Sequence, residues 1–218
     1  MNHQVKSRER VAQYAEVLTP PEIVNAMLDL VKQETERIDS RFLEPACGTG
    51  NFLTEILERK LRVVENHYGK IQLEYERYAV LAVSSLYGVD ILEDNVQECR
   101  ERLFGVFDRA YTRLFGEKAK EKCREAVRYI LARNIIHGDA LSLKTVGEAP
   151  KPIVFSEWSL VNGSLLKRRD FSFHELVAKA SLRELPLFSD QGEEVFIPEP
   201  VREYPPVHFL EVAHAYAE

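Results

Sequence analysis

The sequence predicts an α/β fold built on a doubly wound, mostly parallel sheet with helices on both faces. Long amphipathic patterns of helical period separate short apolar runs, and a helix between two strands is typical of parallel pairing. Two glycines, Gly48 and Gly50, form a turn signal directly after the first run. The apolar runs that have the length and composition of strands lie near 41–45, 87–91, 134–138 and 152–157.

Composition indicates a globular protein. The chain has 218 residues, 45% of them hydrophobic, which is enough for a sizeable core. No apolar run reaches the roughly 18 residues that span a bilayer, and the polar start is unlike a signal peptide, so we expect a cytoplasmic protein without a membrane segment. Three widely spaced cysteines offer neither a disulfide framework nor metal-ligand pairs. We therefore expect reduced thiols and no metal site.

The formal net charge of −6 argues against a protein whose whole surface binds a polyanion such as DNA. Residues 100–133 nevertheless carry an excess of Lys and Arg. Such cations either face a nucleic-acid phosphate backbone or belong to solvated helix faces. The residues concerned are Arg100, Arg109, Arg113, Lys120, Arg124 and Arg128.

The first helix has a clear start signal. Thr19 is placed to cap it, Pro20 to occupy its first position and Glu22 to complete a capping box. Apolar residues then continue at helical spacing as far as Val31. The sequence therefore predicts an amphipathic helix shortly before the first strand.

The glycine turn follows that strand and opens directly into a helix. Such a turn aims main-chain N–H groups and the positive end of the helix dipole at whatever lies above it, which suits a carboxylate or a phosphate. The glycines supply backbone freedom and remove Cβ atoms that would keep a ligand away. Leu53 and the distant Asp90 do not fit the dinucleotide fingerprint, which needs a third glycine and an acid about 20 residues on. A tight turn without a ligand is the alternative.

The second and third strands are expected to end in acids, Asp90 and Asp139. A carboxylate at the carboxyl end of a parallel strand can accept both ribose hydroxyls of an adenosine, and we assign that role to Asp90. Asp90 can also cap the helix that begins near Glu93. His137 has no partner in the sequence and is expected to be a strand residue facing a helix.

The stretch from Glu44 to Leu53 reads Glu-Pro-Ala-Cys-Gly-Thr-Gly-Asn-Phe-Leu. It resembles the S-adenosylmethionine-binding motif of class I methyltransferases, and specifically that of the adenine-N6 DNA methyltransferases of restriction-modification systems. The resemblance implies a Rossmann-like sheet and S-adenosyl-L-methionine as cofactor. Thr19 and its helix resemble the family's N-terminal motif, which closes over the methionine end. The stretch from Gly138 to Ala140 resembles the Gly-Asp-Ala of the family, whose Asp holds the adenine amine. The implied cofactor-binding residues are Thr19, Glu44, Pro45, Ala46, Gly48, Gly50, Asn51, Phe52, Asp90, Ile91, Asp139 and Ala140.

The fourth strand should end where the family carries its catalytic tetrapeptide, an Asp, Asn or Ser followed by two prolines and an aromatic residue. This chain has Ser156, Glu157 and Trp158 there, without the prolines. The resemblance implies that Ser156 and Glu157 accept hydrogen bonds from the target amine and that Trp158 stacks on a flipped base. The alternatives are a degenerate site without catalysis and a Trp158 that belongs to the core.

We expect a cofactor-binding domain over residues 1–160, with an N-terminal helical cap over 1–38, and a Pro-rich, acidic extension over 161–218. In the extension, Val161 to Ser164 read as a turn and Phe171 to Leu185 as a helix. The extension is too short for the three further strands of a complete family sheet and a target-recognition region. We therefore expect a sheet truncated after its fourth strand, with DNA recognition supplied by a restriction or specificity subunit or by a second copy.

Three functions fit the sequence. The first is an adenine-N6 DNA methyltransferase of a restriction-modification or phage-defence system. The second is a non-catalytic pseudoenzyme or regulatory subunit that binds S-adenosylmethionine. The third is a methyltransferase that acts on a substrate other than DNA.

Overall fold

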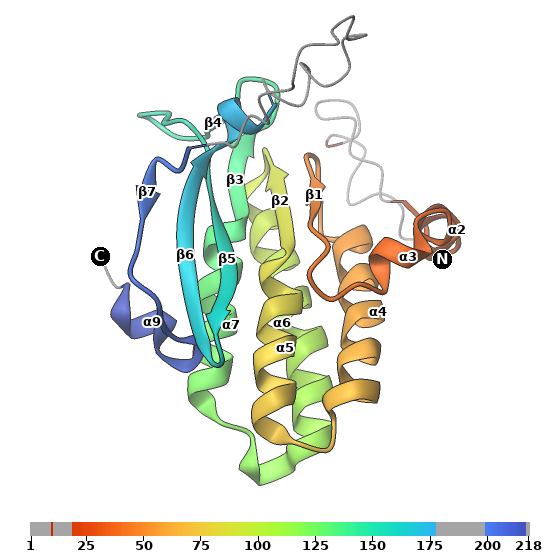
Figure 1. Ribbon diagram of the computed structural model, residues 1–218. Helices are drawn as coiled ribbons and strands as arrows, with labels where there is room; N and C mark the ends of the chain where they lie inside the picture. Colours follow the sequence, from red (N-terminus) through yellow and green to blue (C-terminus); the bar gives the residue numbers. More distant parts are fainter. Residues whose placement is uncertain (1–9, 11–18, 178–198, 217–218) are drawn as a thin grey trace, which may run out of the picture.

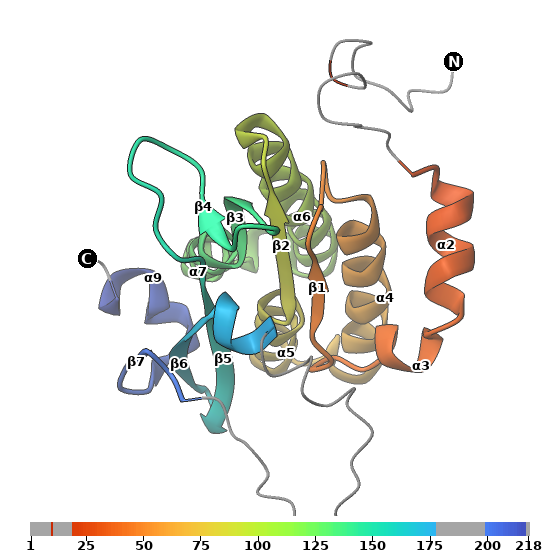
Figure 2. The same cartoon turned by 90° about the horizontal axis from the view of Figure 1, so that it is seen from above.

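The computed structural model describes residues 10, 19–177 and 199–216. Over these residues the protein is an α/β structure with a four-stranded mixed sheet, a second antiparallel sheet and helices packed around them (Figures 1 and 2). The start of the predicted N-terminal motif, before Thr19, lies outside the described residues, as does 178–185 of the helix predicted after Phe171.

The first sheet has the strand order β1-β2-β3-β4. Strands β1 (Phe42–Glu44), β2 (Leu86–Asp90) and β3 (Ile135–Asp139) are parallel, which confirms the first three predicted strands. The short β4 (Lys144–Thr145) pairs antiparallel with β3. The three parallel strands therefore present their carboxyl ends at one edge of the sheet.

Two helices form each crossover between parallel strands. Helices α4 (Asn51–Tyr68) and α5 (Gln72–Ser84) join β1 to β2, and α6 (Glu93–Phe115), η1 (Gly116–Lys118) and α7 (Glu121–Asn134) join β2 to β3. Their apolar faces share one hydrophobic core with the strands. Four helices thus occupy the two intervals in which the sequence has long amphipathic patterns, and the chain turns between α6 and α7 at Gly116, which has a positive φ of 53°.

The N-terminal helix begins one residue later than predicted. Helix α2 (Pro21–Asp29) has Pro20 as its N-cap and no side-chain cap, so the predicted capping box is wrong. Thr19 instead contacts α4, where its carbonyl accepts a hydrogen bond from Asn51 Nδ2 at 2.9 Å. The helix buries Val24 and Leu28, and the short α3 (Lys32–Thr35) follows it. Figure 2 shows α2 beyond α4, at the β1 end of the molecule.

The prediction of a fourth parallel strand is wrong. Strand β5 (Val154–Asn162) belongs to a separate sheet, where it pairs antiparallel with β6 (Leu165–Ser172). The turn at Gly163 (φ 56°), which reverses the chain after β5, confirms the predicted turn signal. The link from β3 to β5, residues 140–153, contains the short β4 and no helix. A parallel neighbour would need a long crossover instead. Two further short strands, β7 (Arg202–Glu203) and β8 (Val207–His208), pair with β6.

The β5–β6 hairpin has two faces because strand side chains alternate. Phe155 lies edge-on to Tyr87 of β2, with ring centroids 5.5 Å apart, so this face covers the first sheet. Trp158, on the other face, packs near Tyr129 of α7 and near Tyr216. The C-terminal η2 (Phe209–Glu211) and α9 (Val212–Ala215) contribute to the same core as the crossover helices. Strand β5 therefore runs through the expected domain boundary at residue 160.

Candidate functional site

A cleft opens at the carboxyl ends of the parallel strands, and each of the three strands ends in an acid. Glu44 is the last residue of β1, Asp90 of β2 and Asp139 of β3. All three line one cavity of about 600 Å³ above the glycine turn. Parallel pairing thus gathers side chains that lie far apart in the sequence.

The glycine turn uses the left-handed conformation that glycine favours, with φ 50° at Gly48 and 85° at Gly50. Gly48 lines the cleft, whereas Gly50 does not. A Cβ atom on Gly50 would lie 2.6 Å from Cys99 Sγ of α6. Gly50 therefore permits close packing beneath the turn, and the structure does not place it among the residues facing a ligand.

Asp90 is bonded to the turn itself. Its Oδ2 accepts a hydrogen bond of 2.8 Å from the main-chain N–H of Gly48, and its Oδ1 accepts one of 2.9 Å from the N–H of Leu92. The amide of Asn95 also donates to Oδ1, at 3.3 Å. The Gly48 N–H that we expected to face a ligand is therefore used within the protein. Oδ1 already accepts two hydrogen bonds, whereas Oδ2 accepts one and keeps a lone pair, so Asp90 can still accept a hydroxyl group.

The other two acids differ in their surroundings. Burial raises the pKa of Glu44, and the hydrogen bond from the Ala46 N–H opposes this only in part. Among the described residues, no Lys, Arg or His forms an ion pair with Glu44. The hydrogen bond from the Leu141 N–H to Asp139, 2.9 Å long, lowers the pKa of Asp139. The cleft thus combines a partly desolvated acid, Glu44, with two acids, Asp90 and Asp139, that accept hydrogen bonds from main-chain N–H groups.

Arg102 braces the turn from α6, and the sequence analysis missed it. Its Nη1 lies 2.7 Å from the Thr49 carbonyl and 2.8 Å from both Thr49 Oγ1 and Asn51 Oδ1. Asn51 in turn donates to the Thr19 carbonyl. One guanidinium therefore connects the glycine turn, the start of α4 and the segment before α2. Arg102 lies 53 residues after Thr49 in the sequence, so no local sequence pattern predicts this contact.

The structure brings nearly all predicted cofactor-binding residues together. Those that line the cleft are Thr19, Glu44, Pro45, Ala46, Gly48, Asn51, Phe52, Asp90, Ile91, Asp139 and Ala140. Residues that line it without having been singled out are Cys47, Thr49, Leu92, Asn95, Gly138 and Leu141. Most of these neighbour the predicted residues in the chain, so widening each motif by a residue or two would have found them.

The structure does not bring the three candidate catalytic residues to this cleft. Ser156 donates a hydrogen bond of 2.8 Å to Asp170, and Trp158 donates one of 3.2 Å to Asn134. Glu157 points to the opposite face of β5 and is bonded to Arg41 and Arg169. Because neighbouring strand residues face opposite sides, the three side chains cannot converge on one substrate.

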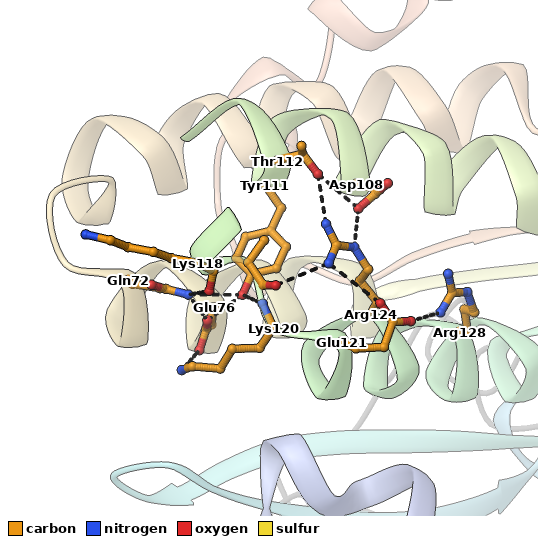
Figure 3. Close-up of polar contacts among 11 residues, drawn as sticks. Gln72, Glu76, Asp108, Tyr111, Thr112, Lys118, Lys120, Glu121, Arg124 and Arg128 are labelled. Atoms are coloured by element: carbon orange, nitrogen blue, oxygen red, sulfur yellow. Dashed lines mark hydrogen bonds and ion pairs between the residues drawn. The ribbon is translucent and has the colours of Figure 1, made fainter. Parts of the chain in front are cut away.

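Most cations of the basic helical stretch are bonded within the chain. Lys120 pairs with the buried Glu76 at 2.8 Å, and Arg124 with Asp108 at 2.6 Å (Figure 3). Figure 3 also shows Glu76 joined to Gln72 and Tyr111, which ties the α6–α7 connection to α5. Further bonded cations are Arg113 with Glu65, Arg128 with Glu121, and Arg100 with the Ile135 carbonyl. This arrangement favours solvated, ion-paired helix faces over a dedicated phosphate-binding surface.

Other features bear on ligands and partners. The three cysteines are free and buried, as expected. Nowhere in 19–177 or 199–216 do three His, Cys, Asp or Glu side chains form a group that could hold a metal ion. Over the same ranges, every helix is too short or too polar to cross a membrane. His137 lies in β3, where its Nε2 is 3.0 Å from the Ile91 carbonyl.

The fold and the cleft define an α/β protein with an acidic pocket at the strand ends. Comparisons of the chain with protein-family models, with curated proteins and with solved structures found no match.

Proposed function

We propose that the cleft binds S-adenosyl-L-methionine and that the chain is the cofactor-binding part of a class I DNA methyltransferase of the adenine-N6 type. The observation that carries the proposal is the convergence of three strand-end carboxylates, Glu44, Asp90 and Asp139, around the glycine turn. The sequence resemblance of this turn and of the third strand end supports the same ligand.

The shape and charge of the cleft fit this cofactor. Its volume, about 600 Å³, lies within the roughly 300–1,000 Å³ of small-molecule sites. The cofactor carries a sulfonium and an ammonium group, and an acid that is buried without a cation, as Glu44 is, becomes more stable beside a positive charge. Polyanionic adenosine compounds such as ATP would instead be repelled by the three carboxylates of the cleft.

The strand ends suggest how the ligand is held. Asp90 would accept a ribose hydroxyl through the remaining lone pair of Oδ2, and Asp139 would accept a hydrogen bond from the adenine amine. Glu44 and Thr19 would lie at the methionine end. When bound, the cofactor supplies an electrophilic methyl group. The three candidate catalytic residues, Ser156, Glu157 and Trp158, are not among those that line the described cleft.

Methyl transfer to DNA therefore requires groups from outside this cleft. We propose that a partner subunit or a second copy supplies them together with the DNA-reading surface, in a cytoplasmic restriction-modification or phage-defence system. The basic helical stretch is too fully bonded within the chain to serve as that surface alone.

A second candidate is a non-catalytic subunit that binds the same ligand for regulation. The burial of Ser156 and Trp158, exposed by 2% and 4%, favours it, because neither side chain can reach a base from the core.

Calorimetric titration tests the binding proposal. We expect S-adenosylmethionine to bind and ATP, which shares the adenosine but is polyanionic, to give no heat. Absence of heat with millimolar S-adenosylmethionine would overturn the proposal. Transfer of a labelled methyl group to unmethylated DNA, by the chain alone and with its neighbouring gene products, then separates the two candidates.

A further inference from the structure

Over the residues that the structure describes, strand β1 is an open edge of the first sheet. Within the described ranges its only paired neighbour is β2, and Figure 1 shows it as the last strand of the parallel set. The N–H of Phe42 donates toward the β2 side, to the Ser85 carbonyl at 3.0 Å. Because main-chain groups alternate in direction along a strand, the N–H and carbonyl of Leu43 point to the open edge. An edge of this kind is a template for another strand.

A second cavity lies directly beside this edge. It has a volume of about 360 Å³ and is lined by residues of β1, β2 and the β5–β6 hairpin. The side chain of Leu43 is 44% exposed at its mouth. The apolar side chains that line it are Phe42, Leu43, Tyr87, Phe155, Phe171 and Leu176. Its volume and aromatic walls suit one large aromatic side chain.

Polar groups of the cavity are also available to an occupant. Tyr87, which is 8% exposed, lines the cavity from β2. Glu157 is clamped between Arg41 and Arg169, and these side chains are 10%, 59% and 34% exposed. Two cations against one acid leave a positive surplus at the rim.

We propose that the β1 edge and this cavity bind an extended segment of another protein chain. The segment adds to β1 as a strand, places an aromatic side chain in the cavity and sets an acidic residue beside Arg41. Main-chain hydrogen bonds supply affinity in this mode, and the side-chain pocket supplies specificity. The positive surplus at Arg41 and Arg169 is the feature that selects an acidic neighbour for the anchor.

This docking mode extends the proposed function. The added strand would run alongside β1, whose last residue, Glu44, lines the ligand cleft. Side chains of the partner would then reach the rim of the cleft, where amine-holding groups are missing. The docking itself does not depend on the ligand, so the two proposals fail separately.

A synthetic peptide tests the proposal with the full-length chain. The probe is a fluorescent peptide of about ten residues that alternates threonine and valine around a central tyrosine followed by aspartate. We expect saturable binding by fluorescence anisotropy and slower hydrogen exchange at the Leu43 amide. A peptide with alanine in place of the tyrosine should bind at least about tenfold more weakly. Absence of saturable binding at millimolar protein overturns the proposal.

Two controls distinguish strand addition from non-specific hydrophobic binding of the peptide. A peptide with N-methyl groups along one edge cannot pair with β1, and binding equal to that of the parent peptide would refute strand addition. Leu43→Lys should abolish binding, whereas Ile23→Lys, at a residue 51% exposed on α2, should leave it unchanged. Equal effects of the two variants would also refute it.

Light scattering and calorimetry complete the test. A dimer of the free chain that Leu43→Lys dissociates would show that a second copy occupies the edge, against the proposal. If the chain binds S-adenosylmethionine but not the peptide, only the docking proposal is refuted. If it binds the peptide but not S-adenosylmethionine, only the proposed ligand is refuted.

Discussion

The main-chain N–H of Gly48 donates a 2.8 Å hydrogen bond to the carboxylate of Asp90. This bond joins the turn after β1 to the end of β2, which lies beside it in the sheet. Asp90 therefore shapes the floor of the cleft as well as lining it. Its removal should affect both folding and ligand binding, and a neighbouring acid without this bond allows the two effects to be separated.

Asp90→Ala should weaken S-adenosylmethionine binding by about tenfold or more and lower the free energy of unfolding by about 1.5–3 kcal/mol, because main-chain donors lose a charged acceptor. Asp139→Ala should weaken binding with little loss of stability, since the Asp139 carboxylate is partly exposed and, among the described residues, bonds only within its own loop. Calorimetry and urea denaturation measure the two quantities. Unchanged affinity in Asp90→Ala would contradict the ribose assignment.

Gly50→Ala should destabilise the protein for two distinct reasons. The left-handed backbone (φ 85°) costs about 1–2 kcal/mol with a Cβ atom, and that atom would lie 2.6 Å from Cys99 Sγ. Cys99→Ala in the same chain should relieve the contact and leave only the backbone cost. Gly163→Ala is the matched control, because Gly163 is also left-handed (φ 56°) but has nothing within 4 Å of its Cβ position. Equal losses at Gly50 and Gly163 would exclude the proposed clash.

The glycine turn and the strand-end acids were predictable because they are local. Each of Glu44, Asp90 and Asp139 follows an apolar run, and parallel pairing brings such ends together without further information. The pairing of the fourth predicted strand, in contrast, could not be predicted from local sequence. An apolar run of strand length has the same pattern whether it joins a parallel sheet or a hairpin.

The environment of Ser156 and Glu157 was also hidden from the sequence. Arg168 and Asp170 lie in a stretch rich in charged residues, which predicts an exposed segment, yet they are only 4% and 6% exposed. Their mutual ion pair, 2.7 Å long, makes burial tolerable and attracts the Ser156 hydroxyl. A pattern of single residues cannot reveal a pair that is buried only because both partners are present.

Lys60 gives a prediction about pH. It is fully buried in α4 and donates to the carbonyls of Ile38 and Ser40 and, at 2.5 Å, to Ser85 Oγ. Burial lowers the pKa of Lys60 to about 7. An unfolded lysine has a pKa of about 10.4, so between these values the unfolded chain binds a proton that the folded chain lacks.

The free energy of unfolding should therefore gain a contribution that rises with pH from about 7 to about 10 and is level below 7. Lys60→Met keeps the length of the side chain and removes the titrating group. Urea denaturation of both proteins at several pH values measures the difference between them. A difference that stays constant over this range would show that Lys60 remains protonated in its ring of oxygen acceptors.

Ser156→Ala distinguishes a structural serine from a catalytic one. The Ser156 hydroxyl donates to Asp170 at 2.8 Å and accepts from Arg168 Nε at 3.0 Å, and the Arg168 guanidinium lies 4.2 Å from the centre of the Tyr204 ring. Loss of the hydroxyl should lower the free energy of unfolding by about 1–2 kcal/mol, because a buried ion pair loses a hydrogen-bonding neighbour. Cofactor affinity, and any methyl transfer measured with the partner present, should stay at the wild-type level. Asp170→Asn with and without Ser156→Ala would show a coupling between the two residues if the role is structural. A folded Ser156→Ala protein that binds the cofactor normally but transfers no methyl group would place Ser156 at the reacting amine instead, and would require β5 to leave the hairpin during the reaction.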